Sequence, residues 1–336
     1  MTDRVVYDVA ASSSGALGIL EDCYEEALRD NGNSYVFLTS TDDLRSLKNV
    51  EVRSYPWVKT SWFHRLFFDW IVGPRIVRQI KPSSILSLQN TVMPRVCIPQ
   101  IVYEHNCLPK AFCETRFSLL QEPNLWIRQN ILGGIITRSL KKADAVVVQS
   151  QWMKERCVKK LGIPPQKVSV RIPQLKHLPE HRYPVQRKPV FFYPATCLPF
   201  KNHQLILEAC RLLNSDISAD RYKIIFTLSG SENNKMQRMK KTAEEEGLPI
   251  EFAGWKSREE VYLLYSQTTL LFVSELESLA LPLYEAKRVG APIIAPDQPY
   301  AHEALDGESS TCWFFRQNDP ISLCSAMKLA LKCISS

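Results

Sequence analysis

The stretch LLFVSELESLALPLYEAKRVGAPII, which runs from Leu270 to Ile294, decides the fold. Its first four residues form an apolar run that predicts a buried strand, and Ser274 to Ala280 reads as the loop that leaves this strand. Pro282 suits the first turn of a helix, where its missing N–H loses no hydrogen bond. A second apolar run, Pro292 to Ala295, predicts the next strand. This order of elements is typical of a parallel sheet wrapped by helices.

The same alternation of β-branched runs and helical stretches extends along the chain and predicts an α/β protein. In the first half, the predicted strands are Val5–Val9, Tyr35–Leu38, Ile85–Leu88, Ile98–Tyr103 and Ala145–Gln149, and the predicted helices are Leu17–Arg29, Trp62–Ile80 and Leu125–Lys142. In the second half, the predicted strands are Val190–Tyr193, Lys223–Ser229, Ile250–Phe252, Leu270–Val273 and Pro292–Ala295, and the predicted helices are Asn202–Leu213, Asn233–Glu246, Ser257–Ser266 and two that start at Pro282 and Asp319.

A proline-rich break divides the chain. The stretch IPQLKHLPEHRYPVQRKP, from Ile172 to Pro189, holds four prolines and lacks both the strand and the helix period. A chain of 336 residues suits two domains of roughly 150 residues each. The sequence therefore predicts an N-terminal domain over 1–172, a linker over 173–189 and a C-terminal domain over 190–336. Two doubly wound, Rossmann-like domains would face a central crevice at the carboxyl ends of their strands, where such sheets bind ligands.

Composition narrows the class of protein. Hydrophobic residues at 45% and charged residues at 23% are ordinary for a globular chain. The net charge of +7 favours a polyanionic partner, such as phosphates, nucleic acid or an anionic membrane surface. No apolar run reaches about 18 residues and the start lacks the pattern of a secretory signal, so we expect a cytoplasmic protein. The ten cysteines are scattered without zinc-binding spacing and read as reduced core thiols.

Two carboxylates flank the loop and the first helical turn of the deciding stretch. Glu277 lies in the loop and Glu285 lies eight residues later, so both can face one pocket and accept hydrogen bonds from the hydroxyls of a sugar or ribose. Between them the helix begins, and its free N–H groups and positive dipole end can receive a diphosphate. The alternative is a favourable first-turn charge at Glu285 and a solvated loop residue at Glu277.

The pattern Glu277-x7-Glu285, with the Gly290 and Pro292 that follow it, resembles the E-x7-E signature of retaining glycosyltransferase family 4, whose fold is GT-B. The surrounding stretches resemble the same lobe in order; they are Tyr193 to Lys201 with KNH, LSGSE at Leu228 to Glu232, and FAGWKSREEVYLLYSQTTLLFVS at Phe252 to Ser274. The resemblance covers nearly all of residues 190–331 and is weaker before the linker. It implies a metal-independent hexosyltransferase.

The resemblance implies separate roles for the two glutamates. Glu285 would hold the hydroxyls of the donor ribose, and Glu277 would contact the transferred sugar. The backbone between them would touch sugar and phosphate, through Ser278, Leu279, Ala280 and Leu281. The family usually has Phe-Gly at the places of Leu279 and Ala280, so this departure bears on the preference for a sugar.

Further donor-binding positions follow from the same resemblance. Lys201 matches the lysine of a cationic pair that neutralises the departing diphosphate, whereas Thr196 stands near the place of the pair's arginine. Gly230 and Ser231 match a turn that brings backbone against the nucleotide. Trp255 and Lys256 match the place of the base. Without the resemblance, these residues would read as a solvated helix flank, a turn and a packing aromatic.

In the N-terminal domain, Gly15 opens a helix after the first strand, where backbone can approach a phosphate or an acceptor. His105 ends a predicted strand and matches a histidine that the family places beside the donor sugar. The alternative for a lone histidine is a structural role. Gln149 and Ser150, at the end of the next strand, would point into the same crevice.

The implied reaction is transfer with retention from a UDP- or GDP-sugar to a saccharide or lipid-linked saccharide acceptor. By resemblance, the pathway is bacterial surface-polysaccharide or lipopolysaccharide biosynthesis. Neither glutamate would be a nucleophile, because this family lets the departing phosphate help to deprotonate the acceptor. The chain has no D-x-D pair, and the prediction is no essential metal, no cofactor besides the nucleotide-sugar donor, and no nucleic-acid partner.

The stretch from Trp57 to Lys81 combines aromatic residues with five basic residues and one acidic residue. It predicts either peripheral contact with the inner face of the cytoplasmic membrane or an ordinary helix with aromatic core contacts. Two other function classes are also built on two such lobes. A nicotinamide-dependent oxidoreductase needs a dinucleotide fingerprint that the chain lacks. A non-catalytic two-lobe sugar- or nucleotide-binding protein is the alternative to an enzyme.

Overall fold

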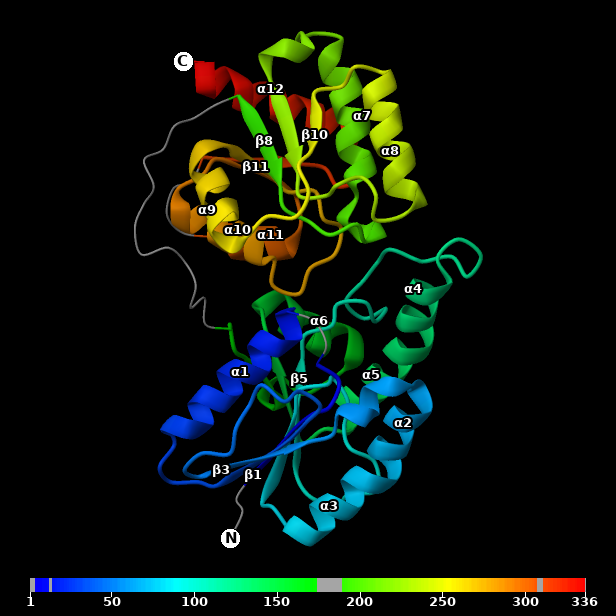
Figure 1. Cartoon of the computed structure of the whole chain (residues 1–336), viewed down its shortest axis with the longest axis vertical. Coiled ribbons are helices and arrows are strands. Elements are labelled where there is room, and N and C mark those ends of the chain that lie inside the picture. Colours follow the sequence, from blue (N-terminus) through cyan, green and yellow to red (C-terminus); the bar gives the residue numbers. More distant parts are fainter. Residues whose placement is uncertain (1–3, 12–13, 174–188, 307–310, 336) are drawn as a thin grey trace. The chain divides into compact units, whose positions relative to one another are not determined.

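The computed structural model describes residues 4–11, 14–173, 189–306 and 311–335 (Figure 1). The chain divides into two compact units, Met1–Gln174 and Leu175–Ser336. The predicted linker over 173–189 lies almost entirely in residues 174–188, outside the described residues.

The N-terminal unit is built on a seven-stranded sheet with the order β3-β2-β1-β4-β5-β6-β7, in which neighbouring strands run parallel. Its strands are β1 (Arg4–Asp8), β2 (Tyr35–Thr39), β3 (Val50–Ser54), β4 (Ser84–Ser87), β5 (Gln100–Glu104), β6 (Ala145–Val148) and β7 (Val168–Val170). Its α-helices are α1 (Ser14–Arg29), α2 (Trp62–Phe67), α3 (Gly73–Ile80), α4 (Pro123–Ile127), α5 (Gly133–Lys142) and α6 (Gln151–Leu161). The strand order reverses between β1 and β4, so the unit is doubly wound.

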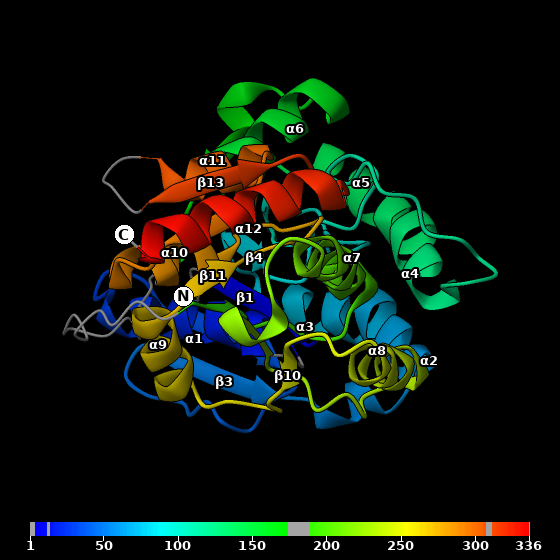
Figure 2. The ribbon, with the colours of Figure 1, turned by 90° about the horizontal axis from the view of Figure 1, so that it is seen from above.

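The C-terminal unit has a six-stranded parallel sheet with the order β10-β9-β8-β11-β12-β13. Its strands are β8 (Val190–Tyr193), β9 (Lys223–Phe226), β10 (Ile250–Phe252), β11 (Thr269–Leu271), β12 (Ile293–Pro296) and β13 (Cys312–Phe315). Its helices are α7 (His203–Asn214), α8 (Asn234–Glu245), α9 (Arg258–Gln267), α10 (Leu281–Val289), α11 (Pro299–Leu305) and α12 (Pro320–Ser335). Helix α12 packs against α7, and Figure 2 shows α12 lengthwise with α7 beside it. The order reverses between β8 and β11.

Local sequence explains where the main elements begin and end. The strands β2 and β8 are rich in aromatic and β-branched residues and are buried except for Val190 at the start of β8, as strands covered by helices on both faces must be. Helix α9 starts with a capping box between Ser257 and Glu260. Helix α10 has Pro282 in its first turn and stops at Gly290, whose φ of 80° is a left-handed conformation that glycine adopts readily.

These observations confirm the predicted class of two doubly wound Rossmann-like domains, and they correct several elements. The stretches 62–80 and 125–142 were predicted as single helices, but π-helical turns at Phe68–Val72 and Arg128–Leu132 interrupt them. Five elements were not predicted; they are β3, α6, β7, α11 and β13. In the described part of the chain, no helix is long and apolar enough to cross a membrane.

Candidate functional site

In the C-terminal unit, two charged residues lie in the loops that follow β8 and β11, the neighbouring strands between which the strand order reverses. Lys201 ends a 3₁₀ turn, Pro199–Lys201, that follows β8, and Glu277 lies in the loop after β11. Because both strands run parallel, both loops emerge at the carboxyl edge of the sheet. Sheets of this kind bind ligands at the carboxyl edge beside such a reversal.

The Lys201 ammonium group and the Glu277 carboxylate form an ion pair. The two side chains are 17% and 14% exposed, so most of the pair is withdrawn from water. A pair in this setting is screened much less by salt than an exposed pair. The structure thus brings together two of the three residues that the sequence nominates for catalysis.

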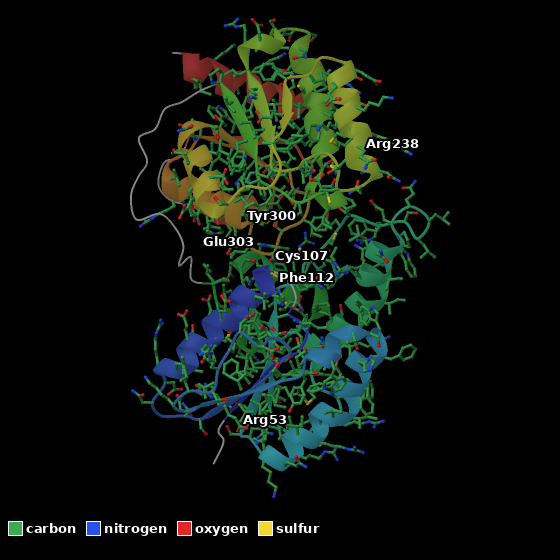
Figure 3. All side chains as sticks on the ribbon, in the orientation of Figure 1. Arg53, Cys107, Phe112, Arg238, Tyr300 and Glu303 are labelled. Carbon is green, nitrogen blue, oxygen red and sulfur yellow. The ribbon has the colours of Figure 1, made fainter. Side chains whose placement is uncertain are left out.

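Main-chain and side-chain hydrogen bonds hold the two loops against each other. The Glu275 amide donates to the Phe200 carbonyl at 2.8 Å, and the Tyr193 hydroxyl donates to the Lys201 carbonyl at 2.7 Å. The Tyr300 hydroxyl, on α11, donates to the Ser274 carbonyl; Figure 3 labels this side chain. The loop that carries Glu277 is therefore fixed at its start.

The turn before α10 has an unusual backbone. Ala280 is the N-cap residue of this helix and has φ 54° and ψ 49°, in the left-handed region that disfavours residues with a Cβ atom. Glycine adopts this conformation readily, which accounts for the glycine that the resembled family usually has at this place. The Ala280 methyl group and the Leu279 side chain are buried, whereas Leu281 is exposed and Ser278 is half-buried. The two buried side chains pack into the lobe, so a ligand would meet this turn through its backbone.

Glu285 projects from α10 toward α9 and has its own partners. The Tyr265 hydroxyl donates to its carboxylate at 3.3 Å and the Tyr262 hydroxyl at 3.5 Å. Burial raises the pKa of Glu285, and the charge of Arg258 and the two hydroxyls oppose this rise. Glu277 and Glu285 thus sit in different environments, one beside a cation and one beside two phenols.

Three residues around Glu285, namely Arg258, Tyr262 and Tyr265, were not among the predicted site residues. They lie in the stretch from Phe252 to Ser274 that carried the family resemblance. The spacing of the two tyrosines, three residues apart, places them on one face of a helix, and this is the signal that could have found them.

The loop after β9 is held by hydrogen bonds between its own residues. The amides of Ser229 and Gly230 donate to the Glu232 carboxylate at 2.6 and 3.0 Å. Gly230 has φ 83°, and a Cβ atom there would lie 2.5 Å from Lys240. A nucleotide phosphate that used the Gly230 amide would replace Glu232 as its partner. Ser231 is exposed, and its hydroxyl pairs with that of Ser229.

The other predicted donor-binding residues lie along the same carboxyl edge. Thr196 is exposed in the loop between β8 and Lys201. Trp255 follows the edge strand β10 and is 83% exposed, so its ring is open to stacking. Lys256 lies beside it, with its ammonium group 3.8 Å from Glu260.

In the N-terminal unit, His105 follows β5 at the carboxyl edge. Its amide donates to the Asn90 side chain at 2.9 Å, and its Nε2 lies 3.1 Å from the Leu88 carbonyl. The same Nε2 lies 3.2 Å from the Asn90 amide nitrogen, so a protonated Nε2 would donate to the carbonyl and an unprotonated Nε2 would accept from the amide. Burial lowers the pKa of His105, which favours the neutral ring.

Three other predicted residues belong to this unit. Gly15 lies in the first turn of α1, and Gln149 and Ser150 follow β6 and are buried. The structure therefore places the N-terminal and C-terminal candidates on two separate sheets. Among the described residues, no three His, Cys, Asp or Glu side chains are grouped so that they could hold a metal ion.

Two family models match the chain. Residues 25–171 match the model described as Glycosyltransferase Family 4, and residues 180–334 match the model described as Glycosyl transferases group 1. Together they follow the two units. No curated protein matches the chain by sequence.

Solved structures with the same architecture are distant in sequence. A glycosyltransferase from Rickettsia africae is 13% identical, with a TM-score of 0.66 over 100% of this chain and 89% of its own. Anabaena Alr3699/HepE, in complex with UDP and glucose, is 12% identical, with a TM-score of 0.67 over 99% of this chain and 90% of its own. WaaG, a glycosyltransferase involved in lipopolysaccharide biosynthesis, is 13% identical, with a TM-score of 0.67 over the same shares.

Proposed function

Because the chain is a glycosyltransferase of the GT-B type, we propose that it transfers a hexose-type sugar, with retention, from a UDP- or GDP-sugar to a saccharide or lipid-linked saccharide acceptor. One observation carries the proposal: Lys201 and Glu277 meet at the carboxyl edge of the donor lobe, beside the reversal of its strand order. A cation for a leaving diphosphate and an acceptor for sugar hydroxyls are thus placed side by side.

The donor would bind along the carboxyl edge of the C-terminal sheet. Glu285 accepts hydrogen bonds from the ribose hydroxyls, and Trp255 stacks on the base. The diphosphate takes Lys201 as its counter-ion and lies against the backbone at the start of α10, where the helix dipole favours negative charge. The sugar then reaches Glu277, whose carboxylate accepts hydrogen bonds from its hydroxyls.

The proposed chemistry needs no protein nucleophile. The bond between the anomeric carbon and the diphosphate oxygen breaks, and the acceptor oxygen attacks from the same face. Its proton passes to an oxygen of the departing diphosphate. The positive charge of Lys201 stabilises the negative charge that develops on the leaving group, which is the kind of electrostatic contribution that preorganised sites supply. The proposal includes no essential metal.

The proposed acceptor class is drawn from two proteins that share the fold. WaaG acts in lipopolysaccharide biosynthesis and HepE was solved with UDP and glucose, and the present chain shares the fold of both. We therefore place the reaction in the synthesis of a surface polysaccharide or lipopolysaccharide, with the N-terminal lobe as the acceptor-binding part.

The first experiment is a thermal-shift screen with UDP, GDP, ADP and their sugars, since a ligand that binds the native state raises Tm. Nucleotides that raise Tm are then tested for transfer and slow donor hydrolysis, with the anomeric configuration of the product read by NMR. Glu277→Gln should lower turnover by about a hundredfold or more, whereas the neighbouring Glu275→Gln should retain it. Tight binding without turnover would instead favour the non-catalytic two-lobe binding protein.

A further inference from the structure

Exposed apolar side chains are concentrated on two helical stretches of the N-terminal unit and on the turn that precedes the second stretch. Ten of the twenty exposed large hydrophobic side chains in the described residues fall within two short segments, 62–70 and 119–135. They are Trp62, Phe63, Leu66, Phe67, Trp70, Leu119, Leu120, Ile127, Ile131 and Ile135. Phe63 is 84% exposed and Leu120 is 94% exposed, so these two project almost wholly into solvent. Clusters of this kind mark interaction sites.

The helices that carry these side chains cover the same face of the sheet. The stretch α2–α3 leads from β3 to β4 and α4–α5 leads from β5 to β6, so both cross the sheet in the same direction. Right-handed crossovers then place both on one face. Figures 1 and 2 agree, because each shows α2 beside α4. We call residues 62–81 and 119–142 together the two-helix surface.

The two-helix surface also carries most of the excess charge of the protein. Residues 62–81 and 119–142 contain eight Lys and Arg residues and two acidic residues, a net charge of +6, whereas the whole chain has +7. Most of the positive balance of the protein therefore arises from 44 residues. The exposed cations in these segments include Arg75, Arg78, Arg128 and Arg138.

Of the two acidic residues of these segments, Asp69 is turned inward and Glu122, just before α4, is half-buried. The Asp69 carboxylate accepts from Arg65 Nε at 2.8 and 3.0 Å and from the hydroxyl of Tyr7, a buried residue of β1. The Asp69 side chain is 19% exposed. Its charge is thus neutralised by Arg65, and the outward cations keep theirs. Arg95 lies over the Trp70 ring at 5.4 Å from its centroid, which adds a further cation at the rim.

We propose that the two-helix surface docks on an anionic phospholipid membrane, with Phe63 and Leu120 inserted between headgroups and the arginines beside the phosphates. Aromatic and aliphatic side chains ringed by Lys and Arg suit this interface, where apolar burial and charge attraction add. A second copy of the same surface fits poorly, because two faces of like charge would repel. The inference extends the predicted contact at 57–81 to a second helix. Only its corollary, that the acceptor is held in this membrane, rests on the proposed function.

The test is flotation with vesicles of phosphatidylcholine alone or mixed with phosphatidylglycerol. The wild type should float with the mixed vesicles only, and added salt should weaken binding. An apolar variant, Phe63→Ser/Leu120→Ser, should lose roughly a hundredfold in affinity, because each buried side chain contributes about tenfold. A charge variant with one change on each helix, Arg75→Gln/Arg138→Gln, should lose roughly fivefold for each cation.

Matched controls lie on the other unit. Ile321→Ser/Leu329→Ser removes exposed apolar side chains from α12, and Arg238→Gln removes an exposed cation from α8; both should float as the wild type does. Absence of flotation, or equal losses in the controls, would overturn the proposal. A dimer that dissociates in the apolar variant, without vesicle binding, would assign the surface to a second copy. Nucleotide thermal shifts on the same proteins test the sugar-transfer proposal separately, since neither set of variants touches the donor site.

Discussion

Lys201 and Glu277 lie 76 residues apart in sequence and form an ion pair at the carboxyl edge of the C-terminal sheet. Their loops leave the adjacent strands β8 and β11, and the hydrogen bond from the Glu275 amide to the Phe200 carbonyl joins these loops directly. The proposed donor therefore meets two charges that already neutralise each other. Its diphosphate must take over Lys201, and its sugar hydroxyls must take over Glu277.

The first prediction concerns this pair. Lys201→Gln should lower kcat by about a hundredfold or more, because a preorganised charge is lost where negative charge develops. Glu277→Gln should lower it similarly, and the double variant should lose far less than the product of the two effects, since residues that act as a unit are not additive. Initial rates with the donor found in the nucleotide screen give these values. Full multiplicativity would show that the pair does not act together.

The second prediction concerns the two phenols at Glu285. Tyr265→Phe and Tyr262→Phe each remove a donor to a buried carboxylate, so nucleotide affinity should fall roughly tenfold, in line with about 1.5 kcal/mol for a hydrogen bond to a charged group. The pKa of Glu285 should rise further above its ordinary value in both variants. Titration calorimetry with the free nucleotide measures the effect. Tyr284→Phe, on the same helix as Glu285, is the control and should bind normally.

The third prediction uses the left-handed backbone at Ala280. Glycine relieves roughly 1–2 kcal/mol of αL strain there, which offsets the lost methyl burial and the added freedom of the unfolded chain. Ala280→Gly should therefore leave the free energy of unfolding within about 1 kcal/mol of the wild type. Ala286→Gly makes the same change at a buried, ordinary helical position of α10 and should lose about 2 kcal/mol. Urea unfolding of both variants checks this, and equal losses would contradict the strain.

The fourth prediction distinguishes the steric clash of an added Cβ atom from backbone strain in the loop after β9. Gly230 and Gly247 both have positive φ, but only Gly230 has Lys240 and Phe252 in the space of a Cβ atom. Gly247→Ala should lose roughly 1–2 kcal/mol of stability from strain alone. Gly230→Ala should lose more and should also weaken nucleotide binding. If both variants bind nucleotide equally, the Gly230 loop lies outside the donor site.

The fifth prediction concerns Asp8, which ends β1 and is almost fully buried. Burial raises its pKa from 3.8 to about 6, although the amides of Ala10 and Ala11 donate to the carboxylate and oppose the rise. A raised folded-state pKa means that stability is fully present below pH 3.8 and is lost as the pH rises through 6. The loss is about 3 kcal/mol, since each pKa unit corresponds to about 1.4 kcal/mol.

Asp8→Asn provides the measurement for this effect. The amide oxygen can accept the same two hydrogen bonds but does not ionise. Unfolding free energies of wild type and variant from pH 4 to 8 should therefore diverge, with the variant more stable by roughly 3 kcal/mol at neutral pH. Parallel curves would show that Asp8 remains ionised throughout.

Sequence patterns were sufficient for several strands. The ranges Val190–Tyr193 and Ile250–Phe252 match β8 and β10, because short runs of β-branched and aromatic residues between turns leave few alternatives. Of the four edge strands, β10 was predicted, whereas β3, β7 and β13 were missed. β3 (VEVRS) mixes charged and apolar residues, since only part of it is buried, and β13 is four residues long.

The site could be predicted in part. Lys201 and Glu277 were nominated by resemblance, and the arrangement of β8 and β11 explains why they meet. The contact of Tyr262 and Tyr265 with Glu285 depends on how α9 and α10 are rotated against each other, which a local pattern does not encode. The closure of the Gly230 amide onto Glu232 depends likewise on the conformation of a loop.

The π-helical turn at Phe68–Val72 has a consequence for which side chains face outward. Such a turn holds one residue more than the α-helical turn it replaces, so everything after it is rotated by about 100° relative to an unbroken helix. In an unbroken helix, Arg75 and Arg78 would point toward the side occupied by the buried Phe68. With the extra residue they share the outward arc of Trp62 and Phe67. The extra residue in the π-helical turn thus brings the apolar side chains before it and the arginines after it onto one face. Deleting one residue in this turn would place them on different faces again.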